Sequence, residues 1–158
     1  MATRLYIFDA DGTLRTTTVA GQPCPHAPEE WRLLPDVRAR LAELPPDARL
    51  GVASNQDHVG YGHLDEHRAR ELLRAMVVAA TGRRLPDGAL ELCPHVREVP
   101  CACRKPGAAM LERLLAFYDV PAAEALFVGD AECDRAAAAR AGIPFAWAHA
   151  FFGRPTGS

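Results

Sequence analysis

The chain has 158 residues, of which 49% are hydrophobic and 24% charged, and its formal net charge is -2. This length and composition are those of one globular domain and exclude disordered, collagen-like and coiled-coil chains. The small negative charge argues against partners that bind an overall basic field, so nucleic acid and membrane surfaces are not expected partners. No apolar run is long enough to span a membrane and no signal-peptide pattern is present, so we expect a cytoplasmic protein.

Short apolar runs alternate with helical patterns along the chain. Strands are predicted at residues 5–8, 50–53, 89–92, 125–128 and 144–147, and helices at about 35–44, 64–81, 107–119 and 134–141. The strands lack polar alternation, so both faces of their sheet should be covered. This order predicts an α/β fold, a three-layer Rossmann-like sandwich with a mostly parallel central sheet. Residues 12–31 fit neither period and are predicted to form one long loop.

Two aspartates follow the first predicted strand, where the ligands of such sheets bind. In an extended segment residues i and i+2 point to the same side, so Asp9 and Asp11 should converge on one small volume. Gly12 then lets the chain turn away. Two like charges so close indicate a bound cation, and the alternative is an ordinary Asp-Asp-Gly turn at the end of a strand.

Further polar groups should meet the aspartate pair at the same edge of the sheet. Ser54 ends the second strand, Lys105 precedes the third helix, and Asp130 and Asp134 follow the fourth strand. A hydroxyl, a cation and additional carboxylates around an aspartate pair are what hydrolysis of a phosphate ester through a carboxylate nucleophile requires.

A second constellation has the spacing C-x-H-x5-C-x-C. It consists of Cys93, His95, Cys101 and Cys103. Three thiolates and one imidazole make a closed tetrahedral Zn²⁺ site, which would be structural because no position remains for water. The alternative is that these cysteines are buried hydrophobic residues. A zinc ion here would stiffen the segment that presents Lys105.

The ordered motifs resemble those of the haloacid dehalogenase superfamily of phosphatases. These are a DxDGT strand end, a hydrophobic strand ending in Ser or Thr, a Lys and a GDxxxD segment. The resemblance implies one HAD-like phosphatase domain without a cap over residues 1–153, which includes the zinc loop at 93–103, and a flexible tail at 154–158. It also implies that Asp9 is the nucleophile that forms an aspartyl-phosphate, and that Asp11 is the general acid and then the general base.

The same resemblance implies the remaining ligands of a small phosphorylated metabolite. The groups that would hold its phosphoryl oxygens and the rest of the substrate are Ser54, Asn55, Arg104 and Lys105. Mg²⁺ would be bound by Asp9, Asp130 and the backbone carbonyl of Asp11, with Asp134 in a supporting position.

The zinc loop narrows the resemblance to capless enzymes that include histidinol-phosphate phosphatases and D-glycero-D-manno-heptose 1,7-bisphosphate phosphatases. The five-residue spacer and the segment 54–57 look more like the histidinol-phosphate members, whereas Ala10 stands where both groups usually have Arg. A substrate with a cationic amine would favour acidic neighbours, for which the candidates are Glu29, Glu30 and Asp57. A second phosphate would need basic neighbours, for which the candidates are Arg15 and Arg104. Both sets are present, so the sequence leaves the substrate open.

Two other functions compete with this interpretation. A polynucleotide 3'-phosphatase shares the four motifs, although the chain has no basic stripe interleaved with aromatic residues. A non-catalytic, zinc-stabilised binding module would retain the fold but should have lost the aspartate pair or the lysine. The sequence gives no prediction of the oligomeric state.

Several cysteine and histidine residues lie outside these motifs. The segment Cys24-Pro25-His26 copies half of the zinc pattern but has no second pair, so a proline-rich loop is expected there, and the alternative is a segment that contacts substrate or a metal. His63 and His67 are four residues apart and are predicted to be surface histidines, because no third ligand accompanies them.

Overall fold

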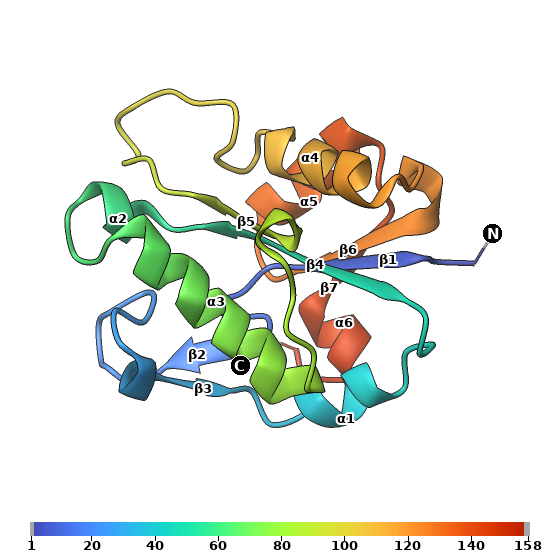
Figure 1. Ribbon diagram of the computed structural model, residues 1–158, viewed down its shortest axis with the longest axis horizontal. Coiled ribbons are helices and arrows are strands. Elements are labelled where there is room, and N and C mark those ends of the chain that lie inside the picture. Colours follow the sequence, from blue (N-terminus) through green and yellow to red (C-terminus); the bar gives the residue numbers. More distant parts are fainter. Residues whose placement is uncertain (1, 157–158) are drawn as a thin grey trace.

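The computed structural model describes residues 2–156 and has a central five-stranded sheet of order β5-β4-β1-β6-β7 (Figure 1). Its strands are β1 (Leu5–Phe8), β4 (Arg49–Asn55), β5 (Leu90–Cys93), β6 (Ala125–Gly129) and β7 (Phe145–Trp147). All neighbouring pairs in this sheet are parallel. Leu5 of β1 lies between Arg49 of β4 and Ala125 of β6. The residues that follow β1 therefore emerge at the middle of the carboxyl edge.

Helices cover both faces of the sheet. On one face lie α1 (Val37–Ala42), α3 (Glu66–Thr81) and α6 (Ala148–Phe152), and on the other lie α4 (Ala109–Tyr118) and α5 (Glu132–Ala141), as Figure 1 shows. A short helix, α2 (Asp57–Gly60), follows β4 at the carboxyl edge. Single 3-10 turns occur at Pro28–Glu30, Asp87–Ala89 and Ala122–Glu124. The predicted three-layer α/β fold with a parallel sheet is confirmed.

Two buried cores explain why the strands lack polar alternation. Phe8 of β1 packs in the core under α1 and α3 with Leu73, whereas Ile7 points to the opposite core with Leu111 of α4. Successive residues of β1 thus enter different cores, and both must be apolar. The longest helix, α3, begins where the side chain of Asp65 accepts a hydrogen bond from the backbone N–H of Arg68 (2.7 Å).

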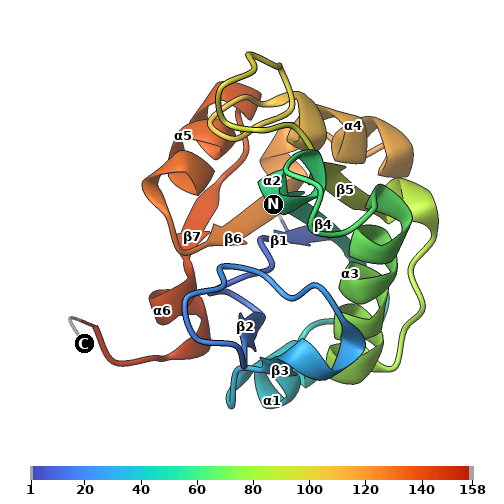
Figure 2. The ribbon, with the colours of Figure 1, turned by 90° about the vertical axis from the view of Figure 1, so that its left-hand side faces the viewer.

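The prediction of one long loop at residues 12–31 is wrong at its two ends. β2 (Arg15–Thr17) and β3 (Trp31–Leu33) pair there as a small antiparallel sheet. Each strand has only three residues, which is too short to show alternation in the sequence. Figure 2, which looks onto the carboxyl edge, shows the loop between these strands beside α2 and α3. The helices α2 and α6 are likewise too short to be predicted from periodicity.

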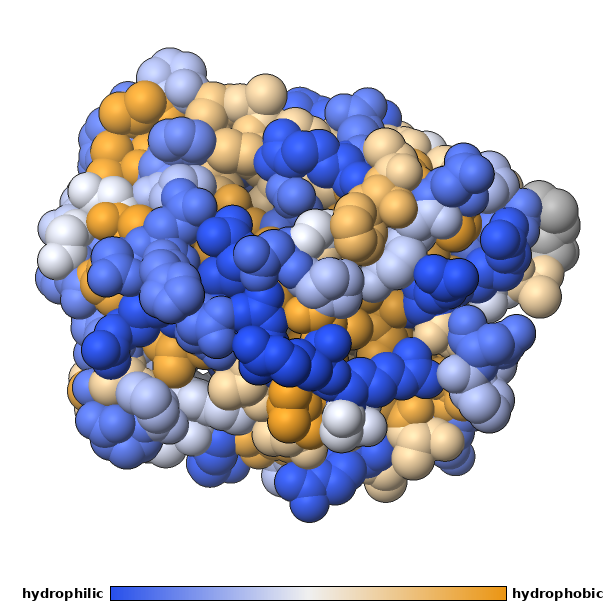
Figure 3. All heavy atoms as spheres, in the orientation of Figure 1, coloured by the Kyte–Doolittle hydropathy of each residue, from blue (hydrophilic) through white to orange (hydrophobic). Residues whose placement is uncertain are grey.

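The end of the described chain is fastened to the domain. Arg154 donates from Nη2 to the backbone carbonyl of Thr13 (2.7 Å) and forms an ion pair with Asp36 (2.9 Å). Residues 157–158 of the expected flexible tail lie outside the described residues. Hydrophilic side chains occupy much of the face seen in Figure 3, with apolar side chains visible between them. Among residues 2–156, no helix combines the length and the apolar character needed to cross a membrane.

Candidate active site

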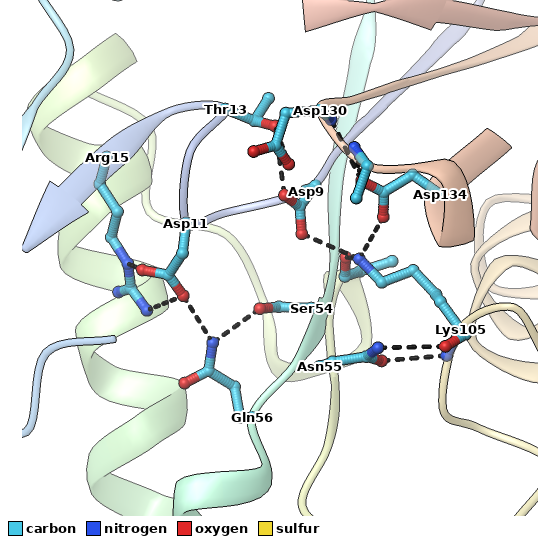
Figure 4. Close-up of polar contacts among 12 residues, drawn as sticks. Asp9, Asp11, Thr13, Arg15, Ser54, Asn55, Gln56, Lys105, Asp130 and Asp134 are labelled. Carbon is cyan, nitrogen blue, oxygen red and sulfur yellow. Dashed lines mark hydrogen bonds and ion pairs between the residues drawn. The ribbon is translucent and has the colours of Figure 1, made fainter. Parts of the chain in front are cut away.

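The site residues predicted from the sequence come together at the carboxyl edge of the sheet (Figure 4). They line an open pocket of about 820 Å³. Those that line it are Asp9, Asp11, Ser54, Asn55, Arg104, Lys105, Asp130 and Asp134. These residues meet because β1, β4 and β6 all end at this edge of the parallel sheet. The loop before α4, which carries Arg104 and Lys105, lies against the same edge.

Lys105 is buried between two carboxylates. Its Nζ lies 2.8 Å from Oδ1 of Asp9 and 2.7 Å from Oδ1 of Asp134, and it donates to the backbone carbonyl of Ala53 (2.9 Å). Burial by itself would lower the pKa of Lys105, but Asp9 and Asp134 raise it above its ordinary value. The ammonium therefore stays charged and fixes the position of the Asp9 carboxylate.

Asp9 is the most strongly perturbed carboxyl group of the pocket. The pKa of Asp9 is raised from 3.8 to about 6, chiefly by burial; Lys105 lowers it and the nearby charge of Asp130 raises it, and the value of about 6 is the net result. Carboxylate oxygens of Asp9, Asp130 and Asp134 lie within 4.8 Å of one another. One cationic side chain does not balance three such carboxylates, and a hard oxygen set of this kind suits Mg²⁺. The observed donors therefore fit the metal that the sequence predicted.

A turn after β1 brings the first and last motifs into contact. Gly12 has a φ of 86°, and a Cβ at this position would lie 2.1 Å from Oδ2 of Asp130. Only glycine combines that conformation with such a close approach. The buried Thr13 then places its hydroxyl 3.2 Å from Asp9 and 3.5 Å from Asp130. Thr13 was part of the DxDGT pattern, yet the sequence alone assigned no role to its hydroxyl.

Asp134 organises the loop that follows β6. Its Oδ2 accepts hydrogen bonds from the backbone N–H groups of Asp130 and Ala131, each at 3.1 Å. Gly129 permits this because a Cβ there would lie 2.5 Å from the side chain of Asp134. The carboxylate of Asp134 thus holds the backbone that carries Asp130.

Asp11 is held by two buried side chains that lie outside the pocket lining (Figure 4). Nε and Nη2 of Arg15 donate to its two carboxylate oxygens at 2.8 and 3.3 Å, and Nε2 of Gln56 donates to Oδ2 at 3.0 Å. The same amide donates to the hydroxyl of Ser54 (2.7 Å). Gln56 therefore couples the second motif to the first, which the sequence did not reveal.

The prediction that Arg15 is a candidate ligand for a second phosphate is wrong. Only 1% of its surface is exposed, and its guanidinium is paired with Asp11. It lies in β2 of the small sheet, which sequence periodicity did not detect, and there it faces the protein interior. The structure makes Arg15 a positioning residue for Asp11.

Asn55 fastens the loop that carries Lys105. Its Oδ1 accepts from the backbone N–H of Lys105 (3.0 Å), and its Nδ2 donates to the backbone carbonyl of the same residue (3.2 Å). Both polar ends of this side chain are therefore engaged with the protein. The lysine is positioned by β4 as well as by its own loop.

The four predicted zinc ligands form one cluster. Ligand atoms of Cys93, His95, Cys101 and Cys103 lie within 4.8 Å of one another. Nδ1 of His95 lies 3.1 Å from Sγ of Cys103 and 3.4 Å from Sγ of Cys93. The backbone N–H of Arg104 donates to Sγ of Cys101 (3.4 Å), which connects the cluster directly to the segment that carries Lys105. Three thiols and one imidazole in this arrangement fit Zn²⁺.

The outer rim of the pocket carries charges of both signs. Arg97 and Arg104 line it, and Nε of Arg97 pairs with Oδ2 of Asp57 (3.2 Å). Of the acidic residues proposed for an amine, Asp57 lines this pocket, whereas Glu29 and Glu30 are absent from its lining among the described residues.

Comparison with known proteins identifies the family. The family model described as HAD-hydrolase-like matches residues 102–149. The "Probable D-glycero-D-manno-heptose-1,7-bisphosphate 7-phosphatase" of Thermoplasma volcanium is 30% identical over 87% of this chain and 93% of its own length. The chain belongs to the HAD-like phosphatases. It is also 32% identical to the D-glycero-beta-D-manno-heptose-1,7-bisphosphate 7-phosphatase of Bordetella bronchiseptica, over 88% of this chain and 76% of that protein.

Solved structures support the same relationship. The heptose bisphosphate phosphatase of B. bronchiseptica, complexed with magnesium and phosphate, has a TM-score of 0.72 at 30% identity and covers 90% of this chain and 79% of that chain. A HAD-superfamily hydrolase from Geobacter sulfurreducens, with a TM-score of 0.58 at 18% identity over 90% of this chain and 85% of that one, shares the fold. Membership of the phosphatases rejects the non-catalytic binding module considered from the sequence.

Proposed function

We propose that this HAD-like phosphatase hydrolyses a phosphate ester of a small phosphorylated metabolite through an aspartyl-phosphate on Asp9. The observation that carries the proposal is the buried Asp9 carboxylate, held 2.8 Å from the Lys105 ammonium in the wall of an open pocket. A carboxylate oxygen held in this position is already oriented to attack phosphorus, so little side-chain entropy is lost when the reaction begins.

The reaction has two displacements at phosphorus. In the first, an oxygen of Asp9 forms a bond to phosphorus while the bond to the ester oxygen breaks, and Asp11 gives its proton to the leaving alcohol. In the second, Asp11 takes a proton from water, the water oxygen attacks phosphorus, and the bond to Asp9 breaks. Phosphate leaves and both carboxyl groups return to their starting states. Arg15 and Gln56 orient Asp11 for both proton transfers, through contacts of 2.8 and 3.0 Å.

The side chains around Asp9 would bind the transferred phosphoryl group. Ser54 and Lys105 would hold its oxygens, because a hydroxyl and an ammonium both donate to phosphoryl oxygens. Mg²⁺ would be held by Asp9, Asp130 and the backbone carbonyl of Asp11, and when bound it neutralises charge that develops on the phosphoryl oxygens. The B. bronchiseptica structure, which is complexed with magnesium and phosphate, supports the choice of Mg²⁺ as the metal.

The cysteine cluster would hold a structural zinc. Cys93, His95, Cys101 and Cys103 supply four ligands, so no position remains for a reacting water. The ion would fix the loop whose next residues are Arg104 and Lys105. The zinc ion would therefore contribute to catalysis by fixing the position of the Lys105 ammonium.

The substrate class that the pocket favours is a sugar bisphosphate. Arg104 lines the pocket beyond the reacting groups; one of its N–H groups contacts the backbone carbonyl of His95, and its remaining donors can receive a second phosphate. The relatives named for a heptose bisphosphate support the same choice. The Asp57–Arg97 ion pair (3.2 Å) engages one candidate residue for each substrate class, so the preference for a sugar bisphosphate rests on Arg104 and on the named relatives.

The proposal is tested by Mg²⁺-dependent phosphate release from a panel of compounds. The panel is D-glycero-D-manno-heptose 1,7-bisphosphate, histidinol phosphate, a 3'-phosphorylated oligonucleotide and an aryl phosphate. We expect the heptose bisphosphate to give the highest kcat/KM and Asp9→Asn to abolish release from every compound. Preference for the oligonucleotide would overturn the substrate class, and an active Asp9→Asn variant would overturn the mechanism.

A further inference from the structure

A second cluster of metal-binding side chains lies at the rim of the pocket and has no part in the proposed reaction. It joins Cys24 and His26, from the loop between β2 and β3, with His58 of α2. The thiol and one ring nitrogen of each histidine lie within 4.8 Å of one another. The sequence showed the first two as an incomplete pattern, and only the fold supplies the third residue.

We propose that Cys24, His26 and His58 bind a second transition-metal ion of the zinc class, distinct from the one at Cys93. A thiolate with two imidazoles is a donor set for Zn²⁺ and related borderline-soft ions, and Mg²⁺ prefers oxygen ligands. Three protein ligands leave one tetrahedral position for water or for a further side chain. His63 is the nearest histidine, because its ring centroid lies 4.6 Å from that of His58.

The spacing of the ligand atoms suits this ion. Zinc bound at its usual distances separates two imidazole nitrogens by about 3.3 Å and a nitrogen from a sulfur by about 3.6 Å. Nε2 of His26 and Nδ1 of His58 are 2.8 Å apart, so they need to separate by only about 0.5 Å. The Cys93 cluster has comparable contacts, with 3.1 Å between His95 and Cys103.

The loop that carries Cys24 and His26 is fixed by contacts that leave their ligand atoms free. Nε2 of Gln22 donates to the backbone carbonyl of Cys24 (2.8 Å) and to Oε1 of Glu30 (2.7 Å). The same carboxylate accepts from the backbone N–H of His26 (3.0 Å). The backbone of both ligands is therefore set before any metal binds, which reduces the entropy lost on binding.

The histidine rings have few other partners. Within residues 2–156, the ring nitrogens of His26 and His58 make no hydrogen bond except the one to each other. The rings of His26 and His63 are stacked, with centroids 5.1 Å apart and an interplanar angle of 5°. Protonating neighbouring imidazoles would bring like charges together, whereas a metal ion uses their neutral forms. A shared cation accounts for this grouping.

A metal here would tie two parts of the pocket wall together. Cys24 and His58 both line the pocket, yet they come from segments that are more than thirty positions apart in the sequence. Coordination by both would hold the loop between β2 and β3 against α2 (Figure 2). The ion would thereby fix the entrance through which the substrate reaches Asp9.

Metal content measured after equilibrium dialysis tests the proposal. The whole chain is dialysed against low-micromolar Zn²⁺ with millimolar Mg²⁺, which occupies the carboxylate site, and zinc per chain is then determined by mass spectrometry. We expect two zinc ions in the wild type and one in Cys24→Ser and in His58→Ala. His67→Ala is the matched control, since His67 is exposed on α3 outside the cluster, and it should keep both ions.

Two further measurements keep the test decisive. The double variant Cys101→Ser/Cys103→Ser should lose the other ion and retain the one at Cys24. Co²⁺ in place of Zn²⁺ should give thiolate charge-transfer absorbance that decreases in Cys24→Ser, with circular dichroism confirming that each variant is folded. One zinc in the wild type would overturn the proposal, and so would a second zinc that survives in folded Cys24→Ser and His58→Ala.

Discussion

Replacing Asp9 by Asn should make the magnesium-free protein more stable at neutral pH. Burial raises the pKa of Asp9 from 3.8 to about 6, and one pKa unit corresponds to about 1.4 kcal/mol. Ionising Asp9 in the folded protein therefore costs about 3 kcal/mol more than ionising it in the unfolded chain. This cost persists although Lys105 lies 2.8 Å away, because the raised pKa already includes its attraction.

The sign of the pH dependence follows from the direction of that pKa change. Between about pH 4 and pH 6 the folded state binds more protons at Asp9 than the unfolded state, so stability decreases as the pH rises. Above about pH 6 the full cost is present. Asp9→Asn cannot ionise, and it should lack this part of the pH dependence.

The assay is urea unfolding in magnesium-free buffer from about pH 4 to pH 8. At neutral pH we expect Asp9→Asn to exceed the wild type by up to about 3 kcal/mol, and Asp47→Asn, at an exposed position, to match the wild type. Added Mg²⁺ should stabilise the wild type and Asp47→Asn but not Asp9→Asn, because it binds the ionised carboxylate. Identical pH profiles for the wild type and Asp9→Asn would refute the reasoning.

Three further outcomes follow from the site. Lys105→Met leaves two buried carboxylates without their cation, so unfolding measurements should show a loss of about 3–5 kcal/mol at neutral pH and a smaller loss in acid, where the carboxylates take up protons. Gly12→Ala places a Cβ 2.1 Å from Oδ2 of Asp130, and titration of activity with Mg²⁺ should show a higher half-saturating concentration, together with a stability loss above about 1 kcal/mol. Asp11→Asn removes the general acid, so steady-state kinetics should show kcat lower by about 100-fold or more with KM little changed; unchanged kcat would contradict the assigned role.

Most of the fold was predictable because it rests on long apolar segments. β1 at Leu5–Phe8 matches its predicted range, and β4, β5, β6 and β7 each lie within two residues of theirs. Such strands are buried on both faces, so consecutive residues in them are apolar and the strands can be recognised in the sequence. β2, β3, α2 and α6 have three to five residues each, and their stability comes from packing against the domain, which periodicity does not report.

The candidate site was predictable wherever a residue ends a strand of the sheet. Asp9 and Asp130 are placed by the parallel topology alone. Arg15 and Gln56 were misjudged or overlooked because their roles depend on side-chain contacts across the fold, at 2.8 Å and 3.0 Å from Asp11. No local pattern distinguishes an arginine that orients a carboxylate from one that binds a ligand. Cys24 and His58 likewise meet only in three dimensions.

The most direct test of the central claim is chemical capture of the phosphorylated enzyme. The protein is mixed with Mg²⁺ and substrate, quenched in acid and reduced with borohydride, which converts an aspartyl-phosphate to homoserine. Peptide mass spectrometry then locates the modified residue. The proposed mechanism predicts homoserine at position 9 in the wild type, dependent on substrate. Phosphate release by an enzyme whose Asp9 is never modified would contradict it.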